Sequence, residues 1–386
     1  MDGRKKITNS GDSRGQNTIK DELGCSSCNI NINKDMKMTS PIVTPLDKME
    51  YIEPTASGNI VIPHGREVYL RCAEKFAKPF DGQTLKAKCV GDKNFIIDGK
   101  VVKYENIKCN SMQRPFPMRT GMLCSGGTEL LKVAHQFPDG VLPTINVCFD
   151  ENYQKTSYAE HTIYPGTKNC KHNVPRENYI TGEFFRGVNV DECYIYIYLS
   201  TCNVDIWSTK VDQIYWDQQI GTCHFVNVAP QWNSFKHGNW FLLANCIREF
   251  ANNYETTLLC WTGVCGICTL PDINGVQREL YLNLDEQNNR TIPVPKLFFR
   301  ILIDSKSREG IVIVGVNNPY LTIEKVRTGG YVVAKDISND INCINWDKAN
   351  IEKGYCYACS VPDFIAVVKD LSLEKLETTG VLNLKK

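Results

Sequence analysis

The sequence has 386 residues, of which 42% are hydrophobic and 23% charged, and its 44 basic and 43 acidic side chains leave a formal net charge of +1. This length allows two domains, or one large domain with an appended module, and the composition is typical of a soluble globular protein. Because the net charge is close to zero, the protein as a whole does not attract nucleic acid or a charged membrane surface. Any site for nucleic acid must therefore be a local basic patch.

Cysteine is the strongest compositional signal, because the chain contains 18 of them. So many cysteines favour an oxidising compartment and disulfide bonds, and we therefore expect a secreted protein. Residues 1–22 lack the apolar core of a signal peptide, so we expect that a leader has been removed. No segment has the length and apolar character of a membrane span, and no membrane partner is expected.

Three cysteine pairs have the spacing Cys-x-x-Cys. This spacing occurs in zinc knuckles, but most other cysteines are isolated along the chain, which favours disulfide partners. The pairs are Cys25/Cys28, Cys265/Cys268 and Cys356/Cys359.

The first half of the chain divides into a tail and a small module. Residues 1–45 are polar and without periodicity, which predicts a disordered tail. Residues 46–125 contain short β-type runs broken by Gly, Asp and Pro, which predict a disulfide-tied β-rich module. Its runs include GNIVIPHGREVYLRC (58–72), LKAKCV (85–90), NFIIDGKVVKYENIKC (94–109) and GMLCSGG (121–127).

Residues 126–386 mix strand and helix patterns. The segment 239–254 has apolar residues at helical spacing and predicts an amphipathic helix. Runs at 297–304 and 310–316 predict a hairpin. Further strands are predicted at 142–150, 193–202 and 223–229. Long strand runs with few helices indicate an α+β fold around a mainly antiparallel sheet.

An ordered set of motifs between residues 126 and 340 resembles the insect branch of the DNA/RNA non-specific endonucleases, which have a ββα-metal core. The finer resemblance is to nuclease-like salivary proteins of blood-feeding flies. The resemblance implies metal-assisted phosphodiester hydrolysis, with a histidine base and one magnesium ion held by an asparagine. The motifs are FVNVAPQWNSFKHGNW (225–240), TGVCG (262–266), VPKLFFRILID (294–304) and GIVIVGVNNPYLT (310–322).

The family's reactive positions are substituted in this chain. Aligned on its motifs, Ile206 replaces the base histidine and Val204 replaces a phosphate-binding arginine. Lys236 stands at the metal-binding asparagine and Ala244 at the helix glutamate, whereas Arg248 is retained. Isoleucine accepts no proton and an ammonium cannot ligate magnesium, so we expect neither catalytic residues nor a bound metal.

The same substitutions favour phosphate binding. If the segment were one helix, Lys236 and Arg248 would lie near whole turns of each other and could grip a backbone phosphate. Lys210, His237 and Trp232 complete the candidate set. In the alternative interpretation Lys236 is an exposed lysine without a role, Trp232 packs beneath the loop, and the nearby histidines are structural.

We therefore expect a protein that binds DNA or RNA without sequence preference and with little or no hydrolysis. One alternative is a weak magnesium-dependent endonuclease. A second is a non-enzymatic interaction protein, which the near-neutral charge favours.

Overall fold

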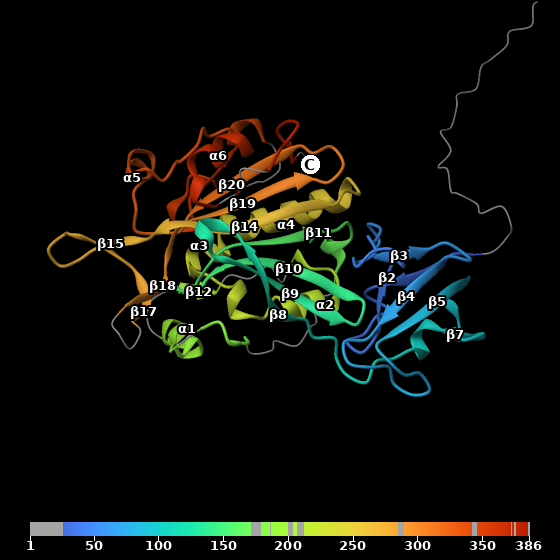
Figure 1. Cartoon of the computed structure of the whole chain (residues 1–386). Helices are drawn as coiled ribbons and strands as arrows, with labels where there is room; N and C mark the ends of the chain where they lie inside the picture. The colour runs from blue at the N-terminus through green and yellow to red at the C-terminus, as the bar shows by residue number, and fades with distance from the viewer. Residues whose placement is uncertain are drawn as a thin grey trace, which may run out of the picture.

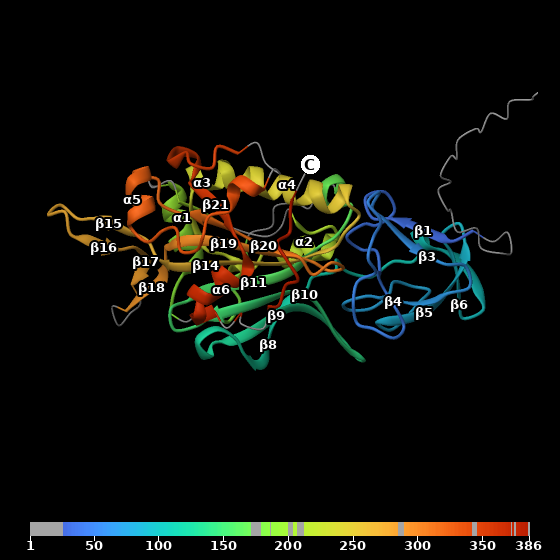
Figure 2. The same cartoon turned by 90° about the horizontal axis from the view of Figure 1, so that it is seen from above.

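The computed structural model describes residues 26–170, 179–185, 187–199, 204–206, 212–284, 289–341, 346–371, 373 and 376–384. It consists of a small N-terminal module and a larger domain, which lie side by side (Figures 1 and 2). Both parts are built mainly from antiparallel strands, so the predicted α+β class with a mainly antiparallel sheet is confirmed.

The N-terminal module contains a five-stranded sheet and a separate pair of strands. The five strands, in their spatial order, are β2 (Ile42–Thr44), β4 (Glu67–Arg71), β5 (Thr84–Gly91), β6 (Asn94–Ile97) and β7 (Lys100–Lys103). The pair consists of β1 (Cys28–Asn31) and β3 (Asn59–Ile62).

The predicted boundary at residue 45 is wrong, because β1 and β2 belong to the module. Ile30, Ile32, Ile42 and Val43 are buried in its core. Ile30 and Ile32 alternate with asparagines, which is the period of a half-buried strand, whereas Ile42 and Val43 are adjacent in the fully buried strand β2. The upper boundary is also displaced, because β8 (Phe116–Leu123) pairs with the large sheet.

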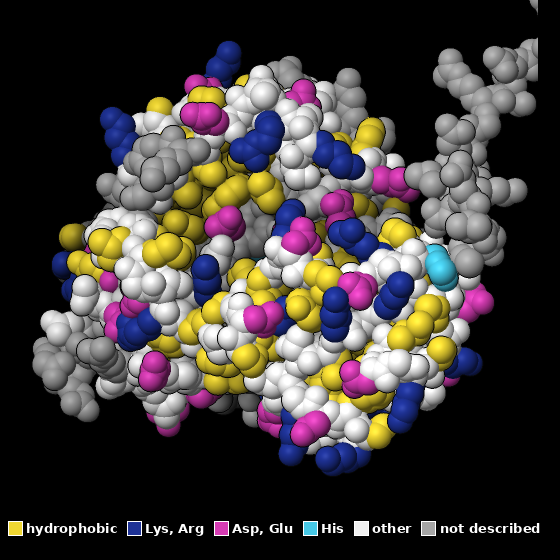
Figure 3. Space-filling model, turned by 45° about the vertical axis from the view of Figure 1, so that its right-hand side comes forward, with side chains coloured by type: hydrophobic (Ala, Val, Ile, Leu, Met, Phe, Trp, Pro, Cys, Tyr) yellow, Lys and Arg dark blue, Asp and Glu magenta, His cyan; other side chains and the backbone are white. Residues whose placement is uncertain are grey.

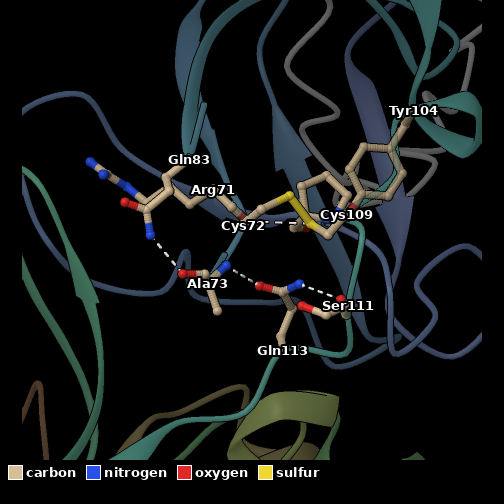
Figure 4. Close-up of a disulfide and its surroundings, with 9 residues drawn as sticks. Arg71, Cys72, Ala73, Gln83, Tyr104, Cys109, Ser111 and Gln113 are labelled. Carbon is tan, nitrogen blue, oxygen red and sulfur yellow. Dashed lines mark hydrogen bonds between the residues drawn. A yellow bond between two sulfur atoms is a disulfide. The ribbon is translucent and has the colours of Figure 1, made fainter. Parts of the chain in front are cut away.

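Disulfides tie the module as predicted, through Cys28–Cys89 and Cys72–Cys109. Beside the second bond, the Gln113 side chain accepts a hydrogen bond from the Ala73 amide (2.6 Å) and donates one to the Ser111 carbonyl (3.0 Å), as Figure 4 shows. The bond and these contacts fix the chain where it leaves the module.

The other cysteines differ in whether they form disulfides. Cys124 bonds to Cys148 and so belongs to the larger domain. Cys356 and Cys359 are free thiols packed in the two different cores on opposite faces of the sheet, so they are neither disulfide partners nor a shared metal site. A spacing of three residues places side chains of one strand on opposite faces.

The larger domain is organised by an eight-stranded sheet. Its strands, in their spatial order, are β21 (Cys356–Cys359), β20 (Gly310–Val316), β19 (Pro295–Asp304), β14 (Leu258–Ile267), β11 (Lys155–Ile163), β10 (Gly140–Asp150), β9 (Glu129–Phe137) and β8. The predicted hairpin is confirmed as β19 and β20, and the strand at 142–150 as β10. Two outlying hairpins pair β15 (Thr269–Pro271) with β16 (Gln277–Glu279), and β17 (Tyr281–Leu284) with β18 (Arg290–Pro293).

The sheet is covered on both faces, which explains why its central strands are almost continuously apolar. Phe298 and Leu302 of β19 face the long helix α4 (Asn239–Asn253), whereas Phe299 and Ile301 face the opposite core. On that opposite side, Phe364 of α6 (Val361–Val367) lies 5.1 Å from Phe299 between ring centroids. Figure 1 shows α4 lying across the sheet.

Helix α4 confirms the amphipathic helix predicted over residues 239–254. Trp240, Leu243, Ile247 and Phe250 are all buried in the core between α4 and the sheet. The other helices are α1 (Val190–Leu199), α2 (Trp216–Gly221), α3 (Asn233–His237) and α5 (Ile323–Thr328).

Two strand predictions are wrong. Residues 193–202 were expected to be a strand, but α1 extends to Leu199; Asp191 and Glu192 in its first turn suit the positive end of a helix dipole. Residues 223–229 were expected to pair, but they form a buried 3₁₀ turn before β13 (Pro230–Trp232). Their apolar run reflects burial on all sides, which periodicity alone does not distinguish from a strand.

The module docks on the domain through buried polar groups. Arg71 of β4 is 2% exposed and makes two hydrogen bonds to the Asp139 carboxylate, of 2.6 and 2.8 Å. The Tyr51 hydroxyl donates to the Asp217 carboxyl group, which His135 Nε2 also contacts at 3.0 Å. Because Tyr51 belongs to the module and Asp217 to α2, the two parts share one polar core.

Candidate functional site

Two short strands and a helix form a ββα unit on the α4 side of the sheet. Strand β12 (Val204–Ile206) pairs antiparallel with β13, so that Val204 lies opposite Trp232 and Ile206 opposite Pro230. The chain then continues into α3 and α4. The positions of the family's base and phosphate arginine therefore lie on the first strand, and the candidate Lys210 lies outside the described residues.

A break separates the candidate Lys236 from the long helix. Lys236 and the exposed His237 end the short helix α3, and Gly238 then leaves the helical region with φ −93° and ψ −132°. A β-carbon at Gly238 would lie 2.0 Å from the Lys353 carbonyl oxygen, so only glycine fits this approach. The expected continuous helical spacing of Lys236 and Arg248 is therefore wrong.

The residues at this turn do not fit a magnesium site. Magnesium prefers oxygen ligands in octahedral geometry, whereas the turn presents the partly exposed Lys236 ammonium. Ala244, at the position of the family's helix glutamate, is buried and has no polar group. Across the described part of the chain, no three His, Cys, Asp or Glu side chains converge in a way that could hold a metal ion.

Trp232 is part of the protein core. It is 5% exposed, and its ring packs edge-on against Tyr320 with 5.4 Å between centroids. Its backbone amide donates to the Asn317 side chain (3.0 Å), which in turn donates to the Pro295 carbonyl (2.9 Å). The buried Trp232 thus presents no free ring face for stacking on a base, in agreement with the alternative interpretation.

His224 is also structural. It is 3% exposed, and its Nε2 lies 3.1 Å from the Pro115 carbonyl oxygen. Burial lowers the pKa of His224 below its usual value, and the contact with Pro115 only partly offsets that effect. A buried imidazole in this setting does not replace the missing general base.

Arg248 is buried in an ion cluster rather than displayed on the surface. It is 7% exposed, and its Nη1 lies 3.3 Å from Oδ1 of Asp212. Its other terminal nitrogen donates to Asn245. The carboxylate of Asp212 also contacts Arg300 Nη2 at 3.1 Å and His161 Nε2 at 3.5 Å.

The sheet and α4 assemble this cluster from distant parts of the sequence. His161 lies on β11, Arg300 on β19 and Arg248 on α4, while Asp212 precedes α2. Burial alone would raise the pKa of Asp212, but Arg300, His161 and Arg248 outweigh burial and hold it well below its usual range. Burial alone would lower the pKa of His161, but Cys260 and Asp212 raise it to about 9.

The sequence interpretation missed two members of the cluster, Arg300 and His161. Arg300 carried a usable signal, because it is the one charged residue inside the apolar run LFFRILI of a predicted strand. A charge in a strand buried on both faces must be paired. His161 carried no such signal, since the run around it is short and of mixed polarity.

The charges on one face of the molecule are mixed. On the face shown in Figure 3, lysine and arginine side chains alternate with aspartate and glutamate and form no continuous basic area. A separate cavity of about 230 Å³ is lined mainly by apolar groups, including Val228, Pro230, Val264 and Leu371, and by none of the candidate binding residues.

Part of the larger domain is similar to a known protein family. Residues 212–364 match the sequence model of the DNA/RNA non-specific endonuclease family. The matched segment includes Asp212, the turn at Lys236, helix α4 and strands β14, β19, β20 and β21.

The chain is also similar to salivary proteins of flies. The chain is 25% identical over 371 residues to the salivary protein Tsal2A of Glossina morsitans morsitans, covering 89% of this chain and 91% of the relative. It is 25% identical over 306 residues to the salivary endonuclease of Lutzomyia longipalpis, covering 72% and 70%. These alignments extend the similarity beyond residues 212–364 into the N-terminal part of the chain.

A solved structure of EndoG with EndoGI aligns over 45% of this chain and 72% of its own, with 16% identity and a TM-score of 0.34. At that score the alignment supports no inference about the site. Among the described residues, no helix is long and apolar enough to cross a bilayer.

Proposed function

We propose that this nuclease-family protein binds DNA or RNA through backbone phosphates, without sequence preference and with little or no hydrolysis. The observation that carries the proposal is Lys236. An ammonium stands where the family places its metal ligand, at the turn that joins β13 to α4. In this proposal the ββα unit still binds the phosphodiester, and the Lys236 ammonium takes the place of the metal ion.

The chemistry of binding follows from the charge of the ligand. Duplex DNA carries one negative charge for each ~1.7 Å of its length, and a lysine that neutralises one phosphate releases condensed counterions. Such a contact positions the backbone and reads no bases, because it touches no base edge. Binding of this kind needs no metal ion.

The test is retardation of a short duplex at a series of salt concentrations, in EDTA and then in magnesium. We expect retardation in EDTA that weakens steeply with salt. Lys236→Ala should lower the slope of log affinity against log salt by about one. Lys100→Ala, which removes an exposed lysine on edge strand β7 of the module, should leave the slope unchanged.

Absence of retardation at low salt would reject the proposal, and an unchanged slope in Lys236→Ala would remove Lys236 from the site.

A second candidate function is a weak magnesium-dependent endonuclease. It is favoured by the relative from Lutzomyia longipalpis, which is named a salivary endonuclease. The same duplex assay distinguishes the candidates, because cleavage must appear only with magnesium and must follow the protein across an ion-exchange gradient. The replacements at Ile206, Lys236 and Ala244 are the reasons to expect no such cleavage.

We further propose that the protein acts outside the cell. Three disulfides, Cys28–Cys89, Cys72–Cys109 and Cys124–Cys148, support this location because such bonds persist in oxidising compartments. The relatives named as salivary proteins support it independently. Recovery of the disulfide-bonded protein from secretion rather than from cell extract is the corresponding measurement.

A further inference from the structure

The cluster around Asp212 holds more positive than negative charge inside the protein. Arg248 and Arg300 are permanently charged, and Asp212 is the one carboxylate that contacts them among the described residues. All three are at most 7% exposed. Two cations and one anion leave a net charge of +1 before His161 is counted.

The positive surplus is not neutralised locally. Within the described part of the chain, Nε and Nη1 of the buried Arg300 have no hydrogen-bond acceptor. Strand register places Arg300 opposite Thr262, with Cys260 and His161 opposite each other in the neighbouring row. The Trp240 ring lies 5.6 Å from the Arg300 guanidinium, which is a weak attraction that does not cancel a charge.

His161 adds to the surplus at neutral pH. The groups that face it are Asp212, Cys260 on β14, and the guanidinium groups that share Asp212. The pKa of about 9 keeps its imidazole largely protonated at pH 7. Burying unbalanced charge is costly unless another charge compensates it.

We propose that the buried Arg300 and Asp212, with His161, set the affinity of the ββα site for phosphate by maintaining a positive charge behind helix α4. This inference rests on the proposed function, since it concerns the same phosphate-binding site. Arg248 transmits the charge outward because its side chain, 9% exposed, is the least buried member of the cluster. The positioning residues here are Arg300 and Asp212, which touch no ligand themselves.

Two substitutions with opposite expected effects test the inference. Arg300→Met removes a cation and should weaken binding of a short duplex in EDTA about threefold to tenfold at low salt. Asp212→Asn removes the anion, keeps one acceptor oxygen, and should tighten binding by a similar factor. A purely structural role predicts that both changes weaken binding.

A pair of the same residue types at the surface provides the control. Arg278 and Asp272 are 3.0 Å apart on the β15–β16 hairpin, which projects from the body of the domain in Figure 1. Arg278→Met and Asp272→Asn each make the same change of charge in water, so their effects should stay below about twofold. Circular dichroism and thermal unfolding of each variant establish that it is folded.

The outcomes separate the inference from the proposed function. Wild-type protein that binds, together with an Asp212→Asn variant that binds no more tightly, would overturn the inference and leave the proposed function intact. If Asp212→Asn does not fold, Arg300→Met decides, and a loss no larger than that of Arg278→Met overturns the inference. Failure of the wild type to bind any duplex would instead overturn the proposed function.

Discussion

Asp212 and Asp217 lie five residues apart and both are buried, but their partners differ. Asp217 is contacted by the Tyr51 hydroxyl and the His135 imidazole, neither of which is permanently charged. Asp212 is contacted by the guanidinium groups of Arg248 and Arg300. The Asp217 carboxyl group joins the N-terminal module to the larger domain, whereas the Asp212 carboxylate contacts two cations.

The two carboxyl groups therefore differ in how completely their surroundings compensate buried charge. The Asp217 group joins the module to α2, and its contacts with Tyr51 and His135 account for its burial. The Asp212 group lies beneath α4 and leaves donors of Arg300 without an acceptor. Groups that are incompletely compensated inside a protein are concentrated at functional sites.

The comparison predicts a larger loss of stability from removing Asp212 than from removing Asp217. Asp212→Ala leaves two buried cations without a counter-charge, which should lower the free energy of unfolding by about 3–5 kcal/mol. Asp217→Ala leaves a hydroxyl and an imidazole unsatisfied, which should cost about 1–3 kcal/mol. Urea unfolding at pH 7, with disulfides intact, measures both.

Equal losses in the two variants would contradict the difference in charge compensation. Binding of nucleic acid provides a second contrast, since Asp217→Ala should leave the salt slope unchanged when the protein is folded.

The next prediction concerns pH. The pKa of His161 is raised to about 9 in the folded protein, against about 6.5 when unfolded, so its charge stabilises the fold below about pH 6.5. That contribution is lost as the pH rises through 9. We expect the stability difference between wild type and His161→Gln to shrink by about 3 kcal/mol between pH 6 and 9.5.

The quantity to measure is the difference in free energy of unfolding between the wild type and His161→Gln at each pH. Burial raises the pKa of the Cys359 thiol to about 12, which also removes stability at high pH, but it does so equally in both proteins. A constant difference across this range would show that His161 carries no charge that matters to folding.

The sequence was sufficient to predict those helices and strands whose apolar residues follow a single clear period. The helix at 239–254 was predicted because Trp240, Leu243, Ile247 and Phe250 repeat at helical spacing, and they are buried as expected. It was insufficient at residues 193–202, where alternating tyrosine and isoleucine imitate a strand. There, the acidic residues of the first turn agree with a helix, but a weak local signal does not override an apparent period of two.

The surroundings of the candidate residues could not be predicted from the sequence. Motif register placed Lys236 in a loop at the entrance of the long helix, whereas it lies in the short helix α3. It could not foresee the break at Gly238, which depends on the approach of the Lys353 carbonyl from a distant segment. It could not foresee the burial of Arg248 either, since Asp212 and Arg300 reach it only through the tertiary fold.

The smallest expected effect concerns the contact between Tyr51 and Asp217. Tyr51→Phe removes one hydroxyl and its hydrogen bond to Asp217 at the interface between module and domain, and keeps the ring that packs 4.9 Å from Tyr215 between centroids. The free energy of unfolding should fall by about 1–2 kcal/mol. Nucleic-acid affinity and its salt slope should not change, because no charge is removed. An altered slope would mean that the interface and the ββα unit are coupled, and the contrast between Asp217 and Asp212 would then no longer separate structure from function.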